Sequence, residues 1–411
     1  MVRKFKGLIV NIYKKQKTMK KLLFLLLIFN INVWGQTKLP IIKATSNRAS
    51  ISDEGVLTKN FWRLAPEAKP DVYTAERTRE TKWVTFYTDI DSIKVKVKPG
   101  TKFDFIVLLN GKDSCYTQIA SAISLESSAK NIKITHDTIP FRVHRNIAFV
   151  QSVINDKDSL NLHLDLGSFN LVITRDAILK KTHLLANRED VLAGKAKPNY
   201  NNLAKVSKLQ MGSLILENPT TLPTLLTAHD ADGRFAGNLF EGKVVEVDYD
   251  KNLIIIHSKL PKKLDGFLKS KLEFIRSYPC VKGLISVQDK NYETSFLLDT
   301  GSEMAMLLDS TWRVRNKFPT DLKLLKLISF KDPRNVKYES KIVNLPKATF
   351  QNIPLTNVPT TLMGSRNPTG FEINFLGNDV LRRFNTIIDF QNDYIYLKPN
   401  KLFNMPFKDA S

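Results

Sequence analysis

The strongest constraint on the fold of this chain is a repeated acidic turn motif. Residues 162–168 read Leu-His-Leu-Asp-Leu-Gly-Ser, and residues 296–302 read Phe-Leu-Leu-Asp-Thr-Gly-Ser. In each copy an apolar run typical of a buried strand ends at an acid, and a glycine follows in a tight-turn pattern. The two acids, Asp165 and Asp299, are 134 positions apart. Two copies of one strand–turn unit predict a chain built from two similar halves.

The repeat extends on both sides of the motif. Residues 152–173 align without gaps onto residues 286–307, and Phe-Ala-Gly-Asn at 235–238 matches Phe-Leu-Gly-Asn at 375–378. An acid before an aromatic residue then ends a strand in each half, at Asp248 and at Asp389. These two acids are candidate extra carboxylates, but their place at strand ends favours turn-forming roles.

A separate β-rich segment precedes the repeat. In residues 83–88 and 93–98, apolar residues alternate with polar ones or form short runs, and many are β-branched or aromatic, which predicts two strands. Asn110-Gly111 is a strong hairpin signal. The segment carries no chemical motif, so its task stays open. We therefore expect a small N-terminal β domain at 37–135, a first lobe at 136–262 and a second lobe at 263–405.

The first 36 residues are typical of an export signal. They hold eight Lys or Arg and no acid, and an apolar run at 22–29 follows Met-Lys-Lys. We interpret residues 1–36 as a signal peptide with an extended basic start, with an uncleaved N-terminal anchor as the alternative. Nothing later in the chain is apolar for long enough to span a bilayer. This pattern predicts an exported protein, periplasmic or extracellular, without a stable membrane anchor.

Charge and metal-type residues exclude several function classes. The chain has 62 Lys and Arg against 40 Asp and Glu, a formal charge of +22. The basic residues are scattered and form no nucleic-acid-binding motif, so we expect a solvated basic surface and no nucleic acid partner. Cys115 and Cys280 form no CxxC pair, which leaves one disulfide or two free thiols open. The six histidines show no zinc spacing, and we expect neither metal nor cofactor.

The duplicated motif resembles the aspartic peptidases of the retropepsin-like and pepsin-like fold. In that family each lobe contributes one Asp-Thr/Ser-Gly loop and a later apolar-apolar-Gly segment. The resemblance covers roughly residues 139–400, and with the leader and the β domain the chain is similar to secreted bacterial retropepsin-like proteins. It implies a mainly β fold in which two tandem retropepsin-like lobes form an acid-protease-like pair of β-barrels after the small β domain.

The resemblance also implies the chemistry of the site. Two carboxylates held close together share a proton, so one acts as general base on a water while the other donates to the substrate carbonyl. Asp165 and Asp299 would be this catalytic pair, acting on a peptide or protein substrate without a covalent intermediate. The matching positions assign Thr300, Gly301, Ser302, Gly167 and Ser168 to support of the loops, with the serine hydroxyls on the outer carboxylate oxygens, and Gly237 and Gly377 to the segments that cross behind them.

One departure from the family pattern concerns Leu166. The family has Thr or Ser at this position, and its hydroxyl cross-links the two loops, which a leucine side chain cannot do. The resemblance also implies a flap, a segment that covers the bound substrate, but no residue pattern assigns it. Tyr200 in 195–209 and Tyr338 in 330–343 are candidate flap residues, with ordinary loop tyrosines as the alternative.

These features predict an exported aspartic endopeptidase that uses Asp165 and Asp299 within one chain. The alternative, favoured by Leu166, is a non-catalytic exported module that binds peptides or proteins on the same scaffold. A third possibility is a homodimer in which Asp299 pairs with Asp299 of a second copy. The matching sequels in both halves favour a monomer that is its own pseudo-dimer.

Overall fold

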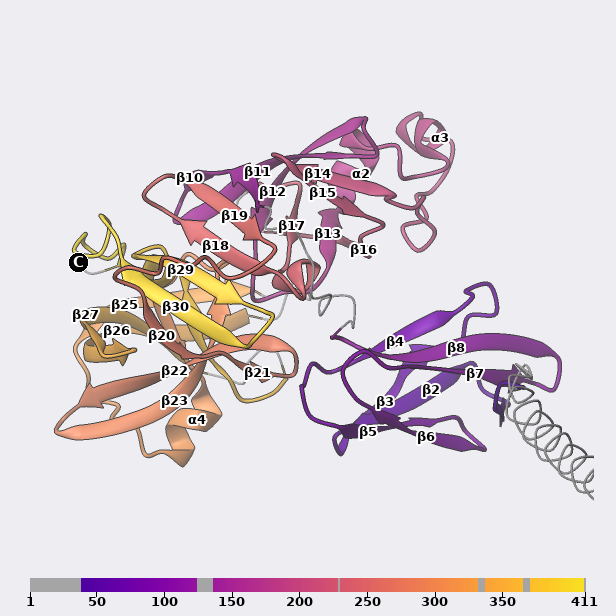
Figure 1. Cartoon of the computed structure of the whole chain (residues 1–411), viewed down its shortest axis with the longest axis horizontal. Coiled ribbons are helices and arrows are strands. Elements are labelled where there is room, and N and C mark those ends of the chain that lie inside the picture. The colour runs from indigo at the N-terminus through magenta and orange to yellow at the C-terminus, as the bar shows by residue number, and fades with distance from the viewer. Residues whose placement is uncertain (1–37, 124–135, 228–229, 332–336, 365–369, 410–411) are drawn as a thin grey trace, which may run out of the picture.

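The computed structural model describes residues 38–123, 136–227, 230–331, 337–364 and 370–409. Within these ranges a small β domain lies beside two β lobes, in indigo, magenta and orange to yellow in Figure 1. The predicted signal peptide at 1–36 lies outside the described residues. No helix in the described ranges is long and apolar enough to cross a membrane.

The N-terminal domain is a sandwich of two four-stranded sheets. Its core includes Phe86 and Phe105, whose ring centroids lie 5.4 Å apart across the sheets. Asn110 and Gly111 both adopt positive φ, which is why this dipeptide makes the turn between two strands. One sheet has the order β1 (Ile41–Ala44), β7 (Lys102–Leu109), β8 (Asp113–Ser121), β4 (Asp71–Ala75), and the other β3 (Val56–Arg63), β2 (Arg48–Asp53), β5 (Lys82–Tyr87), β6 (Ser92–Val97).

The first lobe is one eight-stranded sheet with short helices at its edge. Thr174 caps the longer helix, α2 (Arg175–Lys181), by accepting a hydrogen bond from the Ala177 N–H at 3.1 Å. A shorter helix, α3 (Arg188–Leu192), follows. The strand order is β15 (Leu214–Glu217), β14 (Lys208–Met211), β11 (Ile147–Ile154), β12 (Asp158–Leu164), β17 (Gly233–Phe235), β13 (Leu171–Thr174), β16 (Thr221–Thr224), and β10 (Arg142–His144) pairs with β11.

The second lobe is also an eight-stranded sheet. Its helices are α4 (Ser310–Arg315) and α5 (Asn378–Leu381). The strand order is β21 (Glu273–Ile275), β22 (Tyr278–Val287), β23 (Lys290–Asp299), β28 (Asn374–Gly377), β24 (Met306–Leu308), β27 (Ile353–Met363), β26 (Lys337–Phe350), β25 (Leu324–Lys331).

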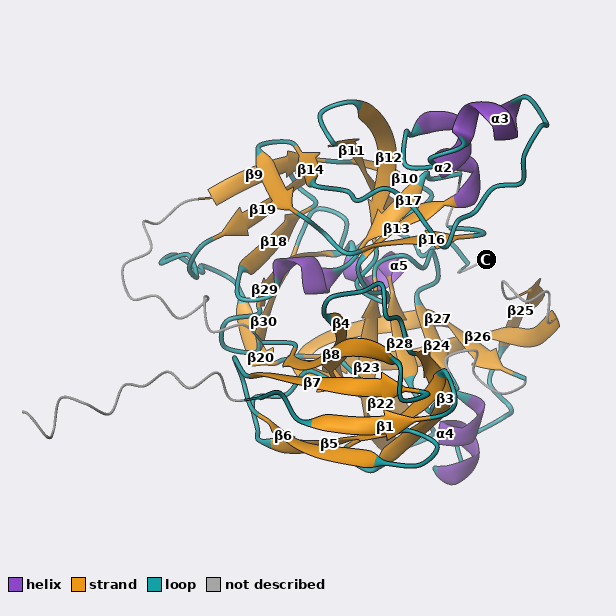
Figure 2. Ribbon diagram, turned by 90° about the vertical axis from the view of Figure 1, so that its right-hand side faces the viewer, coloured by secondary structure: helices purple, strands orange, loops and turns teal. Residues whose placement is uncertain are grey.

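The two lobes repeat one unusual strand arrangement. In each, the strand that leads to the acid pairs in parallel with a short strand from much later in the chain, β12 with β17 and β23 with β28. That short strand also pairs antiparallel with the strand after the acid, β13 or β24. In Figure 2 the strands of the first lobe lie above those of the second lobe. The predicted fold class, a mainly β bilobal chain after a small β domain, is confirmed.

A six-stranded sheet joins the lobes. Its order is β20 (Leu268–Lys271), β30 (Tyr394–Pro399), β29 (Phe384–Asp389), β18 (Val244–Asp248), β19 (Leu253–His257), β9 (His136–Pro140). Asp248 Oδ1 accepts bonds from the N–H groups of residues 250 and 251, and Asp389 Oδ1 accepts from those of residues 391 and 392. The turn roles predicted for these two acids are confirmed.

The predicted ungapped alignment of residues 152–173 onto 286–307 is wrong for the first strand of each hairpin, which precedes the turn. Leu160 and Thr294 are equivalent by their distance from the acids, and their partners across the hairpins are Ser152 and Gly283. Those partners are separated by 131 positions and not 134, because the hairpin of the second lobe is three residues longer. Side-chain patterning alone did not reveal the extra length, since a longer hairpin keeps the same alternation.

Candidate active site

Both acids lie where a strand ends against its crossing partner. Asp165 follows β12, and its N–H donates to the Phe235 carbonyl at the end of β17 at 3.0 Å. Asp299 is the last residue of β23 and lies opposite Gly377 of β28. Because the crossing strand comes from far along the chain, each acid is held by a long-range contact as well as by its own turn.

The two carboxylates face one another across the lobe boundary. A Cβ added to Gly167 would lie 3.0 Å from Asp299 Oδ1 and 3.2 Å from Asp165 Oδ1, so the two oxygens are no farther apart than the sum of these distances. A Cβ on Gly301 would lie 2.7 Å from Asp165 Cγ. Each glycine therefore lies against the carboxylate of the opposite loop, where a side chain would collide with it.

Thr300 braces the two loops. Its hydroxyl accepts a hydrogen bond from the Leu166 N–H at 3.0 Å and donates one to the Leu164 carbonyl at 3.0 Å. The Leu166 side chain has no hydroxyl to make the equivalent hydrogen bonds to the second loop. It is buried instead. Its Cδ2 and the ring of Phe390 both lie within 3.3 Å of the place a Gly237 Cβ would take. The hydroxyl of the second loop thus links the loops by hydrogen bonds, and apolar packing of Leu166 replaces the hydroxyl that the family has in the first loop.

The serines support the turns through the backbone. Ser168 Oγ donates to the Asp165 carbonyl at 3.3 Å, and Ser302 Oγ accepts from the Met304 N–H at 3.4 Å. The resemblance implied that these hydroxyls bond the outer carboxylate oxygens. In the structure they bond backbone groups instead. Asp165 Oδ1 accepts instead from the Gly167 N–H at 2.9 Å.

The register of the crossing strands corrects the pairing of Gly237 with Gly377. Leu164 lies opposite Phe235, and the equivalent Leu298 lies opposite Leu376. The residue that follows is Ala236 in the first lobe and Gly377 in the second, so Gly237 is displaced by one position. Gly377 has no room for a side chain, since a Cβ would lie 2.1 Å from the Met304 carbonyl.

Asp299 has the electrostatics of a protonated acid at neutral pH. Its pKa is raised to about 8, first by burial and then by the charge of Asp165. Hydrogen bonds from the N–H groups of Gly301 and Ser302 and the charge of Arg234 oppose this rise. The net effect is a carboxylic acid that keeps its proton beside a second carboxyl group.

Arg234 is a site residue that sequence reasoning missed. It lies in the middle of β17, and its Nε is 3.3 Å from Asp165 Oδ2. Its side chain is 25% exposed, so the pair is only partly shielded from solvent. The guanidinium thus places a positive charge beside one oxygen of Asp165. The sequence motif gave no signal for it, because the match of 235–238 with 375–378 aligns Phe235 with Phe375, and only the strand register makes Arg234 equivalent to Phe375.

Tyr278 is a second missed residue. It begins β22, two residues before Cys280, which lies opposite Leu297 of β23. Burial raises the pKa of its hydroxyl, and the charges of Asp165 and Asp299 raise it further while Arg234 opposes them. Its ring centroid lies 4.6 Å from that of Phe169. Tyr278 therefore adds a neutral hydroxyl to the electrostatic surroundings of both acids.

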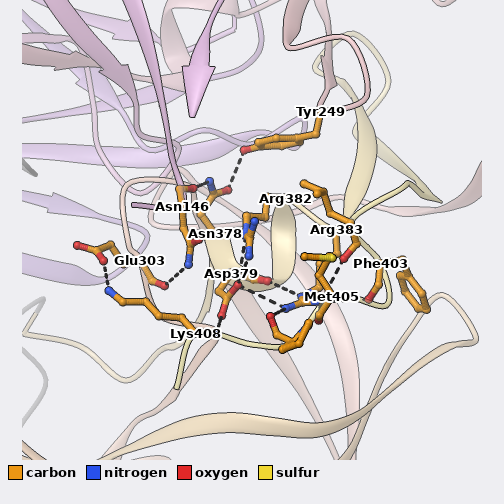
Figure 3. A network of polar contacts seen from close by, with 12 residues as sticks. Asn146, Tyr249, Glu303, Asn378, Asp379, Arg382, Arg383, Phe403, Met405 and Lys408 are labelled. Carbon is orange, nitrogen blue, oxygen red and sulfur yellow. Dashed lines mark hydrogen bonds and ion pairs between the residues drawn. The ribbon is translucent and has the colours of Figure 1, made fainter. Parts of the chain in front are cut away.

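A polar network holds the second loop from behind (Figure 3). The Asn378 N–H, at the start of α5, donates to the Ser302 carbonyl at 2.8 Å. Its side-chain oxygen accepts from the Tyr249 hydroxyl at 3.0 Å, and its amide nitrogen contacts the Asn146 carbonyl of the first lobe. Asn378 thus ties the second loop to both the first lobe and the shared sheet.

The remaining sequence candidates lie away from this cluster or outside the described residues. Tyr200 packs against the core beside Arg175, whose guanidinium carbon is 5.0 Å from its ring centroid. The segment 330–343 includes the end of β25 and the first half of β26, but residues 332–336 and the side chain of Tyr338 are outside the described part. Cys115 and Cys280 are both buried free thiols, which answers the open disulfide question.

Comparisons with known proteins give a likeness in structure but none in sequence. No protein-family model matches the chain, and no curated protein matches it in sequence. Among solved structures, the crystal structure of the aspartic proteinase from Irpex lacteus is similar at 12% identity and a TM-score of 0.42. The match covers 67% of this chain and 100% of that chain. At that identity function does not transfer, so the geometry of the site alone carries the functional interpretation.

Proposed function

We propose that this chain is an exported aspartic-type endopeptidase that hydrolyses peptide bonds with Asp165 and Asp299. The observation that carries the proposal is the reciprocal placement of the two carboxylates, each lying against the glycine of the other loop. Such a pair can hold one water and one shared proton between two acids. Export rests on the leader-like pattern of residues 1–36.

The unequal surroundings of the two acids assign their roles. Asp165, paired with Arg234, is the carboxylate that takes a proton from the attacking water. Asp299, which keeps its proton, donates to the carbonyl oxygen of the scissile peptide. The roles reverse as the amine leaves, because the amine nitrogen takes up a proton while the carbonyl re-forms.

This assignment favours activity near neutral pH. The reactive state has one proton on the pair, and Asp299 retains its proton up to about pH 8. We expect kcat/KM to fall above that pH as Asp299 ionises.

The decisive experiment is cleavage of a mixed peptide library by the purified protein from pH 3 to pH 9, with and without pepstatin. Cleavage should be abolished in both Asp165→Asn and Asp299→Asn and retained in Asp176→Asn, which changes an exposed acid on α2. Absence of cleavage by the folded wild-type chain at every pH would refute the proposal. Activity retained by Asp165→Asn would refute the intrachain pair.

A non-catalytic peptide-binding module is the second candidate, favoured by two residues. Leu166 supplies no bracing hydroxyl, and Arg234 occupies one side of Asp165. If this candidate is right, library peptides bind without being cut, and Asp165→Asn leaves their affinity unchanged.

Pairing of Asp299 with a second copy is the least supported reading. The space opposite Asp299 is filled by Gly167 and Asp165 of the same chain. A dimer of that kind would require the first lobe to move away. Activity independent of protein concentration, together with a monomeric mass in solution, is the expected result.

A further inference from the structure

The N-terminal domain is fixed to both lobes through Arg77. This side chain is 4% exposed, with Nε 2.7 Å from Glu241 Oε2 of the first lobe and Nη2 2.7 Å from Asp393 Oδ1 of the second. Its guanidinium carbon lies 3.8 Å from the ring centroid of Phe274. A buried arginine that satisfies two carboxylates holds the domain in one position relative to the catalytic loops.

A cavity of about 820 Å³ lies between this domain and the catalytic loops. Leu166, Ser168 and Phe169, the residues that follow Asp165, line one side of it, and Ser277 and Pro279 on either side of Tyr278 extend that wall. The volume lies in the range of ligand-binding cavities. The cavity therefore adjoins the proposed active site directly.

The opposite wall is a free strand edge. Residues 72–77, which include most of β4, all line the cavity. Within the described part of the chain, β4 is the last strand of its sheet and pairs only with β8. An edge strand presents unpaired backbone N–H and C=O groups to whatever lies beside it. An extended peptide is the ligand that matches such an edge, since it can add as a further strand.

The side chains around this edge favour an uncharged, apolar segment. Phe61 and Val72 line the cavity and are 44% and 42% exposed, respectively. The charges nearby are balanced, because Arg77 pairs with Glu241, and Glu76 and Arg276 have opposite signs. Large apolar groups left uncovered in a walled cavity are typical of a binding site for apolar side chains.

We propose that this cavity binds an extended, apolar-rich peptide segment, which pairs with the free edge of β4 and places its side chains on Phe61 and Val72. The inference rests on the proposed function in that the segment belongs to the peptide being cleaved. The N-terminal domain then acts as a substrate-holding wall, and recognition reaches beyond the residues at the scissile bond.

The first test measures binding without cleavage, in the full chain carrying Asp299→Asn. The probe is a fluorescein-labelled twelve-residue peptide of alternating valine and threonine. Phe61→Ala combined with Val72→Ala should weaken binding about tenfold, because two apolar contacts are lost. Trp83→Ala is the matched control, since Trp83 is an apolar residue of the same domain, 50% exposed and outside the cavity lining. Equal loss in the control, or no binding of the probe by the parent chain, overturns the proposal.

The second test addresses the strand edge itself. Two versions of the probe carry N-methyl groups on alternate residues, one on the valines and one on the threonines. Only alternate N–H groups of an added strand point toward its neighbour, so one version should lose binding and the other should keep it. Equal binding of both versions, whether kept or lost, excludes pairing with β4.

The outcomes separate this site from the proposed chemistry. If the catalytically intact chain cuts neither the probe nor any peptide of the mixed library but binds the probe through Phe61 and Val72, the peptidase proposal fails and the β4 site stands as a peptide-binding site. If the probe is cut and the double variant has an unchanged KM, the peptidase proposal stands and the β4 site is wrong.

Discussion

At the scale of single residues, two chemically identical acids acquire different properties from their neighbours. Asp299 is enclosed and has a pKa raised to about 8, whereas Asp165 lies beside the Arg234 guanidinium. Burial is the first cause of the raised pKa of Asp299, and Arg234 Nε lies 3.3 Å from Asp165 Oδ2. The pair is therefore asymmetric before any substrate arrives, and the asymmetry depends on one arginine.

Replacing Arg234 should change the pH dependence of catalysis. Arg234→Met removes the cation that lies 3.3 Å from Asp165 Oδ2, so we expect kcat/KM to fall about tenfold because the carboxylate loses a neighbour that positions it. It also removes a charge that lowers the pKa of Asp299, so the alkaline limb should move to higher pH. Arg234→Lys keeps the charge and should restore most of the activity. Superimposable pH profiles for wild type and Arg234→Met would contradict this role.

The Asp299 proton should also appear in the stability of the fold. The folded chain binds this proton more tightly than the unfolded chain, in which the pKa is 3.8. The stabilisation is complete below pH 3.8 and is lost as the pH rises toward about 8. Asp299→Asn, which mimics the neutral acid, should have the same urea midpoint as wild type at pH 4 and a higher one at pH 8.

The matched control for this pH dependence is Asp289→Asn, in the exposed turn between β22 and β23. It should leave the urea midpoint unchanged relative to wild type at both pH values. Parallel pH curves for Asp299→Asn and wild type would mean that Asp299 is ionised in the folded protein.

At the scale of elements, neither strand–turn unit is complete alone. The loop of each lobe closes on the other through a glycine that leaves room for the opposing carboxylate. The Thr300 hydroxyl links the two loops through hydrogen bonds, and the equivalent residue of the first lobe, Leu166, has no hydroxyl. Leu166 is buried beside Gly237, so this loop is held by packing and by the hydrogen bond that its N–H donates.

Removal of the Thr300 hydroxyl should cost both stability and activity. Thr300→Val would leave the buried Leu166 N–H and Leu164 carbonyl without their partner, at about 1–3 kcal/mol for each unsatisfied group. Thr300→Ser retains the hydroxyl and should behave like wild type within about 1 kcal/mol. Urea unfolding and kcat measure the two effects. Full activity in a folded Thr300→Val variant would show that apolar packing alone is enough to align the loops.

At the scale of the whole molecule, the N-terminal domain and the two lobes are held together by contacts near the candidate site. The shared sheet pairs β18 of the first lobe with β29 of the second, and Arg77 fixes the N-terminal domain to both. Arg79 reinforces this attachment, with Nε 2.5 Å from Asp393 Oδ2. The domain therefore forms part of the surroundings of the proposed active site.

Loss of Arg77 should loosen this attachment. Arg77→Met leaves the Glu241 carboxylate without its partner in a largely buried interface, a change that costs about 3–5 kcal/mol in comparable pairs. Limited proteolysis should then release the N-terminal domain much faster. Lys180→Met is the control, since its ion pair with Asp176 is exposed and worth about 0–1 kcal/mol. Equal proteolysis of both variants would mean that Arg77 is not the anchor.

The sequence by itself determined the strand-rich character, the turns and the positions of the two acids. Alternating apolar residues, the Asn110-Gly111 turn and the Asp-x-Gly-Ser repeats act through neighbouring residues, so they can be read without a fold. For the same reason Asp248 and Asp389 were correctly interpreted as turn residues.

The tertiary structure alone decided which groups meet. Arg234 reaches Asp165, Thr300 braces Leu166, and Arg77 joins the N-terminal domain to the lobes, all across large separations in the chain. Hairpin length and crossing-strand register likewise depend on which strands pair. Local patterning specifies the face on which a side chain lies but not the partner it finds there, because that partner is brought in by the packing of distant segments.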